Sequence, residues 1–159
     1  MDTFVKVLVF LIPFSSTASV ENLHDIGVGS CWFQAGKLYE IHPYLLYAIA
    51  DKESSFNPNA VNRRTSDEDV GLMQINSFWY PKLKQIGIER EDLFDPCTSI
   101  HVGAWVLAQS IEIFGNTWEA VGAYNVGTSK ANWAKAARQK YSDDVRLRYF
   151  NVIERMRNE

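Results

Sequence analysis

The carboxyl group with the best context for chemistry is that of Glu53, which ends an apolar segment and precedes a polar one. The residues before it, LLYAIADK at 45–52, repeat apolar side chains with the 3.6-residue period of a buried helix. A carboxyl at the end of such a helix is partly removed from water, and this desolvation raises its pKa. It can then hold a proton near neutral pH and act as a general acid. A lone Glu near a helix end is more often a surface residue, so its context decides.

That context consists of three segments in a fixed order. Glu53 opens ESSFNPNAVN, a polar loop leads to DVGLMQINS at 69–77, and AYNVG follows at 123–127. Together these segments resemble the lysozyme-like lytic transglycosylases, which cleave the glycan of bacterial peptidoglycan. The resemblance runs from about Cys31 to Tyr149, and a chance match to all three segments is very improbable.

A narrower likeness is to the small transglycosylases that accompany type III secretion, type IV secretion and conjugation machinery. It rests on CW at 31–32 after a leader, on LLYAIA at 45–50 and on WEAVGAYN at 118–125. It implies local opening of the wall for a secretion or pilus apparatus. The partners it implies are peptidoglycan glycan strands and a component of that apparatus that localises or activates the enzyme.

The resemblance also implies a fold and a reaction. The fold is mainly α, of the α+β lysozyme-like class, with a helical lobe and a small loop or hairpin lobe around residues 55–75 flanking a substrate cleft. Glu53 protonates the oxygen of the β-1,4 bond between N-acetylmuramic acid (MurNAc) and N-acetylglucosamine (GlcNAc). It then accepts the proton of the sugar's 6-hydroxyl, which closes on C1 and gives a 1,6-anhydro product. The substrate's N-acetyl group is the expected stabiliser of C1 between these steps, so a second protein carboxylate is optional. The resemblance implies no cofactor.

Asp69 is the candidate second carboxylate. It stands just before Val70, where c-type lysozymes carry theirs, and the order of residues around it is similar to that of those lysozymes. We therefore expect Asp69 to face Glu53 across the cleft and to stabilise the oxocarbenium-like state, the role of the second carboxyl in lysozyme. The competing interpretation is that Asp67, Glu68 and Asp69 form an exposed acidic loop.

The other motif residues suit substrate binding better than proton transfer. Gln74 and Asn76 can hydrogen-bond N-acetyl groups or orient a sugar ring, and Met73 offers a soft apolar contact. The resemblance assigns Tyr124 and Asn125 to the wall beside the catalytic Glu. From there the Tyr124 hydroxyl could donate a hydrogen bond to that carboxyl.

Apolar periodicity predicts a mostly helical chain with one polar interruption, a loop or short hairpin at 55–72. The clearest helix spans 98–114, because Thr98 or Ser99 can cap its start and Gly115 ends it. On the last helix, core packing explains Tyr149 better than a match to a late tyrosine of the family. The other expected helices are 31–40, 43–54, 77–85, 117–124, 129–141 and 143–157.

Residues 1–19 have the pattern of a secretory signal, with Lys6, a short apolar run and small residues before the cut. The alternative is an amphipathic first helix of the domain. Because residues 30–159 contain no repeat or linker, we expect a single domain over 20–159. No apolar run approaches the roughly 20 residues that span a bilayer. A cleaved signal without an anchor predicts a periplasmic protein with no stable membrane insertion.

Two cysteines, Cys31 and Cys97, favour a disulfide in an exported protein. Closing so long a loop could stabilise the fold by about 4 kcal/mol on the chain-entropy model. Two buried free thiols are the alternative. We expect no metal site, because these cysteines and the scattered His24, His42 and His101 lack the spacing of metal ligands.

Charge excludes one class of function and leaves another open. The 159 residues carry 16 Lys and Arg against 19 Asp and Glu, a net charge of −3, and no basic-aromatic motif, which argues against a nucleic-acid-binding module. Residues 130–159 hold eight basic and four acidic side chains. They form either a solvated helix face or a surface for an anionic partner.

Two other functions compete with the transglycosylase. A true lysozyme would hydrolyse the same bond with water, and Asp69 is compatible with both reactions. A non-catalytic wall-binding or assembly protein could have kept the fold. The intact Glu53 and its flanking motif argue against this last alternative.

Overall fold

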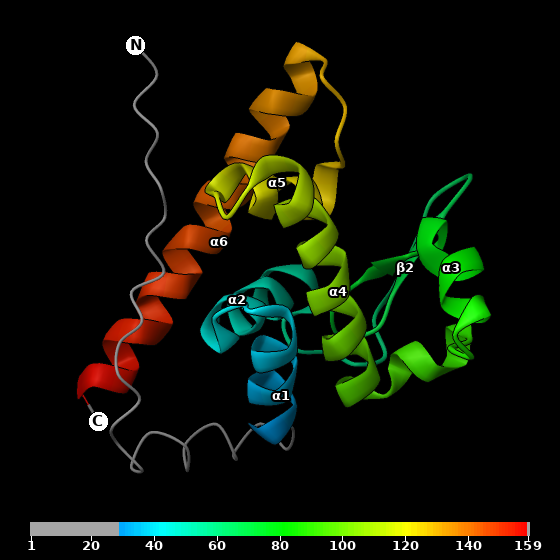
Figure 1. Cartoon of the computed structure of the whole chain (residues 1–159), viewed down its shortest axis with the longest axis horizontal. Helices are drawn as coiled ribbons and strands as arrows, with labels where there is room; N and C mark the ends of the chain where they lie inside the picture. The colour runs from blue at the N-terminus through cyan, green and yellow to red at the C-terminus, as the bar shows by residue number, and fades with distance from the viewer. Residues whose placement is uncertain (1–28, 159) are drawn as a thin grey trace.

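The computed structural model describes residues 29–158, so the signal-peptide prediction for residues 1–19 lies outside the described residues. Five helices pack together as the larger lobe: α1 (Gly29–Tyr39), α2 (Pro43–Ser54), α4 (Pro96–Phe114), α5 (Trp118–Val126) and α6 (Asn132–Asn158). The smaller lobe contains β1 (Val61–Arg63), β2 (Glu68–Val70), β3 (Ile75–Asn76), η2 (Ser77–Trp79), α3 (Tyr80–Gln85) and η3 (Arg90–Phe94). Figure 1 shows β2 and α3 on the side of α4 that faces away from α6. The prediction of a mainly α fold with a small second lobe is confirmed.

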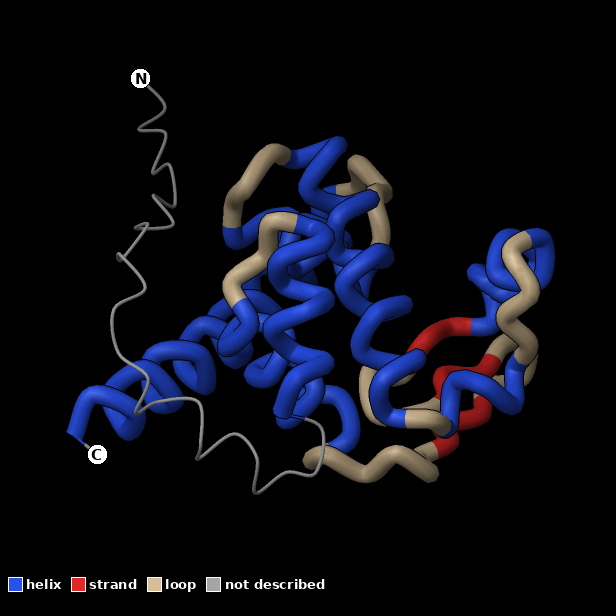
Figure 2. Tube along the Cα trace, turned by 60° about the horizontal axis from the view of Figure 1, so that its bottom comes forward, coloured by secondary structure: helices blue, strands red, loops and turns tan. Residues whose placement is uncertain are grey.

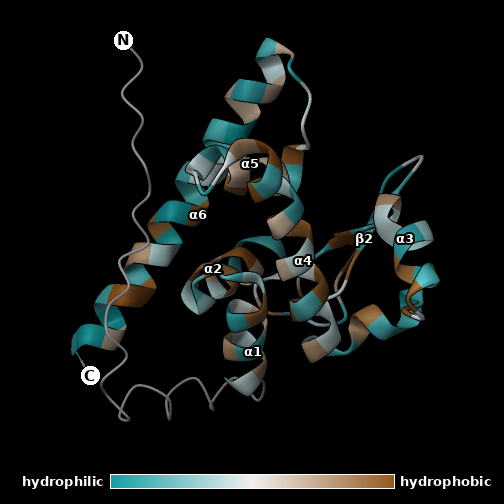
Figure 3. Cartoon of the chain, viewed as in Figure 1, coloured by the Kyte–Doolittle hydropathy of each residue, from teal (hydrophilic) through white to brown (hydrophobic). Residues whose placement is uncertain are grey.

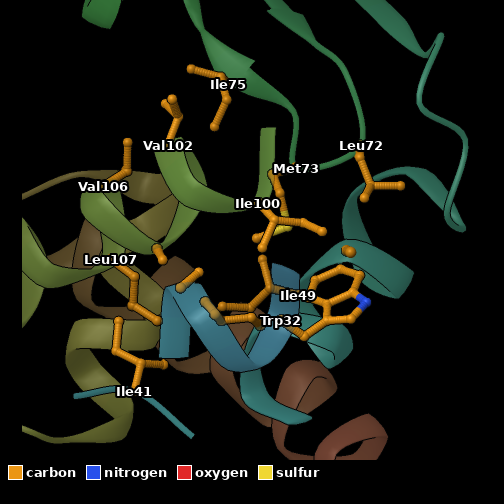
Figure 4. Close-up of a cluster of buried hydrophobic side chains, with 14 of the residues drawn as sticks. Trp32, Ile41, Ile49, Leu72, Met73, Ile75, Ile100, Val102, Val106 and Leu107 are labelled. Atoms are coloured by element: carbon orange, nitrogen blue, oxygen red, sulfur yellow. The ribbon is translucent and has the colours of Figure 1, made fainter. Parts of the chain in front are cut away.

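Helix α4 is the centre of the core. Pro96 lies in its first turn, and the Asp95 side chain accepts a hydrogen bond from the Thr98 N–H, so the helix starts slightly earlier than predicted. Its Ile100 and Leu107 are fully buried and meet apolar side chains of α1, α2 and the smaller lobe in one cluster (Figure 4). Figure 3 shows how much more hydrophilic the long helix α6 is. The core therefore lies around α4, with α6 covering one flank.

The polar segment predicted as a loop or short hairpin is part of a three-stranded antiparallel sheet of order β1-β2-β3 (Figure 2). Asp69 in the middle strand pairs with Asn62 on one side and with Asn76 on the other. Because directly opposite residues point to the same face of a sheet, these three polar side chains form a row. The strands are too short for sequence periodicity to reveal, and the third lies beyond the predicted loop.

The two helices predicted at 129–141 and 143–157 are one continuous helix, α6. Ser142 followed by Asp143 resembles a helix start. The Ser142 hydroxyl instead donates to the Gln139 carbonyl at 3.0 Å, one turn back in the same helix. Val145 and Val152 of this continuous helix are buried, and their burial holds the helix against the core.

Two further connections hold the helices together: ion pairs between the end of α2 and α6, and a disulfide between α1 and α4. Lys52 and Asp51 near that end form ion pairs with Asp144 and Arg148 of α6, and Arg148 also bonds Asp144 at 2.9 Å. A disulfide joins Cys31 of α1 to the start of α4, with 5.5 Å between the two Cα atoms, as predicted. No helix within residues 29–158 is long and apolar enough to cross a membrane.

Candidate active site

A cleft opens between the two lobes and contains most of the residues singled out from the sequence. Glu53 reaches it from the end of α2, Asp69 from the middle strand, and Tyr124 and Asn125 from α5. The remaining lining residues are Arg64, Gln74, Ile75, Asn76, Trp79 and Val106. Of the predicted catalytic and substrate-binding residues, only Met73 is absent from this lining.

The position of Glu53 depends on an abrupt end to α2. Ser55 and Phe56 follow it with φ angles of 50° and 63°, values that non-glycine residues rarely adopt and that persist only where surrounding contacts hold them. The Phe56 ring packs on Tyr47, with 4.4 Å between centroids. The Ser54 hydroxyl donates to the Leu72 carbonyl at 2.7 Å, which ties this helix end to the smaller lobe.

Glu53 has the proton affinity of a general acid. Burial raises its pKa to about 7, and the hydrogen bond from the Tyr141 hydroxyl opposes this rise while the negative charge of Asp69 adds to it. The positive charges of Lys52 and Arg64 lower the pKa of Glu53 by smaller amounts. Near neutral pH both the protonated and the ionised carboxyl are therefore accessible. It can act as a proton donor in one step and as an acceptor in the next.

Tyr141 occupies the role that the sequence suggested for Tyr124. The Tyr124 hydroxyl donates to the Met73 carbonyl at 2.7 Å, whereas Tyr141 from α6 donates to Glu53 Oε1. Burial and the negative charge of Glu53 raise the pKa of both tyrosines well above the usual value, so both remain neutral donors. A single long helix at 129–157 places Tyr141 on the same buried stripe as Val145, four residues later, whereas two separate helices over 129–141 and 143–157 do not reveal this relation.

Asp69 is buried in the wall of the cleft, and both of its carboxylate oxygens have partners. Oδ1 accepts a hydrogen bond from Asn76 Nδ2 at 2.7 Å, and Oδ2 lies 2.8 Å from Arg64 Nη2. The neighbouring Glu68 instead bonds Arg90, with 2.6 Å between Oε1 and Nε. The three consecutive acids therefore do not form one exposed acidic loop.

The amide side chains in the cleft organise its wall. Gln74 Nε2 donates to the carbonyls of Gly71 at 2.9 Å and Ala60 at 3.2 Å. Asn76 bonds Asp69 on one side, and its Oδ1 accepts from the Phe78 N–H at 2.8 Å. Both amides thus hold the short strands together at the edge of the cleft.

Met73 differs from its expected position at the cleft. Its side chain is fully buried and packs against Gly103 of α4, where a Cβ would lie 2.7 Å from the Met73 methyl (Figure 4). The Met73 N–H donates to the Ser99 hydroxyl at 3.1 Å, which turns the side chain into the core. Met73 therefore supports the wall from behind, and its side chain does not reach a sugar in the cleft.

An aromatic surface extends the cleft beyond the carboxylates. Trp79 lines the cleft and packs edge-on against Trp105 of α4, with 5.0 Å between ring centroids. Phe78 beside it is 71% exposed. Aromatic faces of this kind suit the apolar faces of sugar rings. The aromatic run at 78–80, directly after the QINS segment, was the sequence signal for this surface.

The comparisons with known proteins agree with this geometry. The model of the transglycosylase SLT domain family matches residues 30–146. Protein IpgF of Shigella flexneri is 40% identical over 154 residues, which cover 96% of this chain and 93% of that protein. Invasion protein IagB of Salmonella typhimurium (strain SL1344) is 47% identical over 125 residues, which cover 77% of this chain and 72% of that protein.

A solved structure shares the fold. The lytic transglycosylase Slt of Pseudomonas aeruginosa, solved as an inactive mutant, superposes with a TM-score of 0.59 and 24% identity. The match covers 76% of this chain but only 22% of that larger protein, so it supports the fold alone, and it confirms the predicted lysozyme-like architecture. With the family match over residues 30–146, the chain belongs to the SLT family and is a peptidoglycan lytic transglycosylase.

Proposed function

We propose that Glu53 is both the general acid and the general base of a cleavage that consumes no water. The main support is a carboxyl with a pKa of about 7 in the wall of the cleft, with a neutral tyrosine donating to it. Protonated Glu53 gives its proton to the oxygen between MurNAc C1 and GlcNAc C4 as the C1–O bond breaks. The ionised carboxylate then takes the proton of the MurNAc 6-hydroxyl as that oxygen bonds C1. The product carries a 1,6-anhydro ring, and Glu53 regains its proton.

Asp69 is the proposed stabiliser of the positive charge that develops at C1. Its carboxylate lines the same cleft as Glu53 and is fixed by Asn76 and Arg64. Preorganised charge of this kind stabilises an oxocarbenium-like state without reorganisation. The same observation favours a second candidate function, a hydrolytic lysozyme, because Glu53 and Asp69 could divide the work as lysozyme's two carboxyls do.

Product analysis separates these functions. Purified peptidoglycan is digested with the wild type and with Glu53→Gln, and the released muropeptides are identified by mass spectrometry. We expect 1,6-anhydro ends from the wild type and a loss of activity of about 100- to 10,000-fold in Glu53→Gln, the size of a general acid–base contribution. Reducing ends alone would support the lysozyme. Near-wild-type lysis by Glu53→Gln would contradict the role of this carboxyl.

We further propose that residues 1–19 are a cleaved signal peptide and that 20–159 act in the periplasm as one domain. The enzyme would open the wall locally for a secretion or pilus apparatus, with a component of that apparatus as its localising partner. Support comes from the leader-like sequence and from the likeness to a relative named as an invasion protein. Pull-down from envelope fractions that recovers no component of such an apparatus would count against this role.

A further inference from the structure

The unusual feature of the second carboxylate, Asp69, is that each of its oxygens contacts another polar side chain of the cleft. Asn76 Nδ2 donates to Oδ1 at 2.7 Å, and Arg64 Nη2 lies 2.8 Å from Oδ2. Asp69 itself is 9% exposed. Its negative charge is therefore fixed in the cleft wall, and one acceptor site on each oxygen is already engaged by another side chain.

This occupation limits what Asp69 can do chemically. To attack C1 as a nucleophile, or to take a proton from water as a base, a carboxylate must present a free lone pair to the reacting atom. An oxygen that accepts a charge-assisted hydrogen bond is held toward its partner, and the lone pair on that side is not available to a second hydrogen. Its charge still stabilises a cation nearby, since this requires no bond to C1.

We propose that Arg64 determines the reaction outcome by restricting Asp69 to this electrostatic role. Because Arg64 engages Asp69 Oδ2, Asp69 is less available to accept a proton from water, which favours closure by the substrate's own 6-hydroxyl over hydrolysis. This inference rests on the proposed function, because it presupposes that the wild type yields 1,6-anhydro ends.

The competing steps differ in one bond and in one proton acceptor. In the anhydro route O6 bonds C1, and its proton returns to the Glu53 carboxylate. In hydrolysis the oxygen of water bonds C1, and one proton of that water passes to a carboxylate in the cleft lining, either that of Glu53 or, once released from Arg64, that of Asp69. In both routes Glu53 supplies the proton that the leaving GlcNAc oxygen receives, so atoms and charge balance.

The turn between β1 and β2 fixes the guanidinium in this position. The Arg64 N–H donates to the Asp67 carbonyl at 2.8 Å, and Arg64 Nη1 lies 3.4 Å from Asp67 Oδ1. The Arg64 side chain is 52% exposed, so its replacement leaves the core intact. The adjacent Arg63 is more exposed and lies 3.6 Å from Glu68, away from the cleft lining. Arg63, the adjacent residue of the same type at the end of β1, is therefore a matched control.

The test measures the ratio of reducing to 1,6-anhydro ends released from purified peptidoglycan by the full-length mature enzyme. We expect Arg64→Gln to raise this ratio about three-fold or more, the effect that a partly exposed ion pair can exert. Arg63→Gln should leave the ratio unchanged. Arg64→Lys, which keeps the positive charge, should give a ratio between those of the wild type and Arg64→Gln.

A double variant ties the effect to Asp69. In Arg64→Gln with Asp69→Asn, the gain in reducing ends should disappear, because an amide cannot accept the proton of water. An unchanged ratio in Arg64→Gln, beside anhydro ends from the wild type, would overturn the role of Arg64 and leave the proposed function standing. Reducing ends alone from the wild type would overturn both. A gain that persists in the double variant would also overturn the inference, since water would then react without Asp69.

Discussion

At the scale of single residues, the proton on Glu53 is set by opposing neighbours. Burial raises its pKa to about 7, the hydrogen bond from Tyr141 lowers it, and the charge of Asp69 raises it again. The first step requires the protonated carboxyl and the second requires the ionised one. A pKa near the working pH serves both steps, so activity should fall as the pH rises above about 7 and Glu53 loses its proton.

Replacing Tyr141 by Phe should shift this alkaline limb. The Tyr141 hydrogen bond favours the ionised form of Glu53, so its loss raises the pKa and moves the limb to higher pH. Activity at the optimum should fall about tenfold or more, because a hydrogen bond to a charged group is lost. The measurement is kcat/KM against pH on a soluble glycan substrate.

Tyr149→Phe is the matched control for this variant. Tyr149 lies on the same helix but packs against His42 and Trp118, with ring centroids 5.5 Å and 6.1 Å away, outside the lining of the catalytic cleft. Its pH profile should match that of the wild type. An unmoved alkaline limb in Tyr141→Phe would mean that the hydroxyl does not control the proton on Glu53.

The sequence predicted those site residues that lie inside contiguous motifs, and it missed those that only folding brings near. Glu53, Asp69 and the amides follow from segments whose order and residue types are local information. Tyr141 is 88 residues away from Glu53 in the chain, and its segment does not show that its buried helix face meets that carboxyl. Arg64 lies in a segment whose composition predicts a polar loop, and its role depends on which carboxylate its side chain meets.

At the scale of elements, the turn between β2 and β3 is the joint that positions both walls of the cleft. Side chains from three helices hold its backbone: Ser54 and Tyr124 donate to the Leu72 and Met73 carbonyls, and Ser99 accepts from the Met73 N–H. The strands on either side carry Asp69 and the amide that bonds it. Strain in this turn should therefore reach the catalytic wall directly.

Gly71→Ala tests the turn, with Gly87→Ala as its control. Both glycines have a φ of 78°, but a Cβ at Gly71 would lie 2.1 Å from the Leu93 carbonyl oxygen, whereas nothing lies within 4 Å at Gly87. Gly87→Ala should cost about 1 kcal/mol of unfolding free energy for its backbone conformation alone. Gly71→Ala should cost several-fold more, since a backbone segment must also move.

Chemical denaturation of the two variants provides this measurement, and wall lysis well below the unfolding midpoint provides a second one. Gly71→Ala should also lose activity, because the displaced turn carries the strand of Asp69, while Gly87→Ala should retain it. Equal losses of stability in both variants would show that the close approach to Leu93 can relax at little cost.

The helices were predicted well where apolar periodicity is long and bounded by Pro or Gly, as at 43–54 and 98–114. The sheet was underestimated because strands of two or three residues carry too few side chains to show alternation. Ser142 and Asp143 are of types that suit a helix cap, but α6 is continuous through them, with buried side chains on both sides.

At the scale of the whole molecule, the cleft lies between two lobes that the chain joins twice. The disulfide closes a loop of 66 residues in sequence separation, and this loop contains Glu53, Asp69 and the entire smaller lobe. Tyr141, which donates a hydrogen bond to Glu53, lies outside this loop. The bridge therefore limits the freedom of one half of the site in the unfolded chain.

Reducing the Cys31–Cys97 bridge should accordingly lower stability far more than activity. The chain-entropy model gives about 4 kcal/mol for a loop of this length, which corresponds to a fall of roughly 10–15 °C in Tm for a domain of this size. Thermal unfolding of the wild type with and without reductant measures this change.

The double variant Cys31→Ala with Cys97→Ala is the control. Its Tm should be close to that of the reduced wild type and should not change when reductant is added. At temperatures well below both midpoints its kcat should stay close to that of the wild type, because the contact of Glu53 with Tyr141 and the ion pairs of α2 with α6 do not involve the bridge. A wild type whose Tm is insensitive to reductant, with two thiols that react freely, would contradict the bridge and with it the oxidising compartment that it implies.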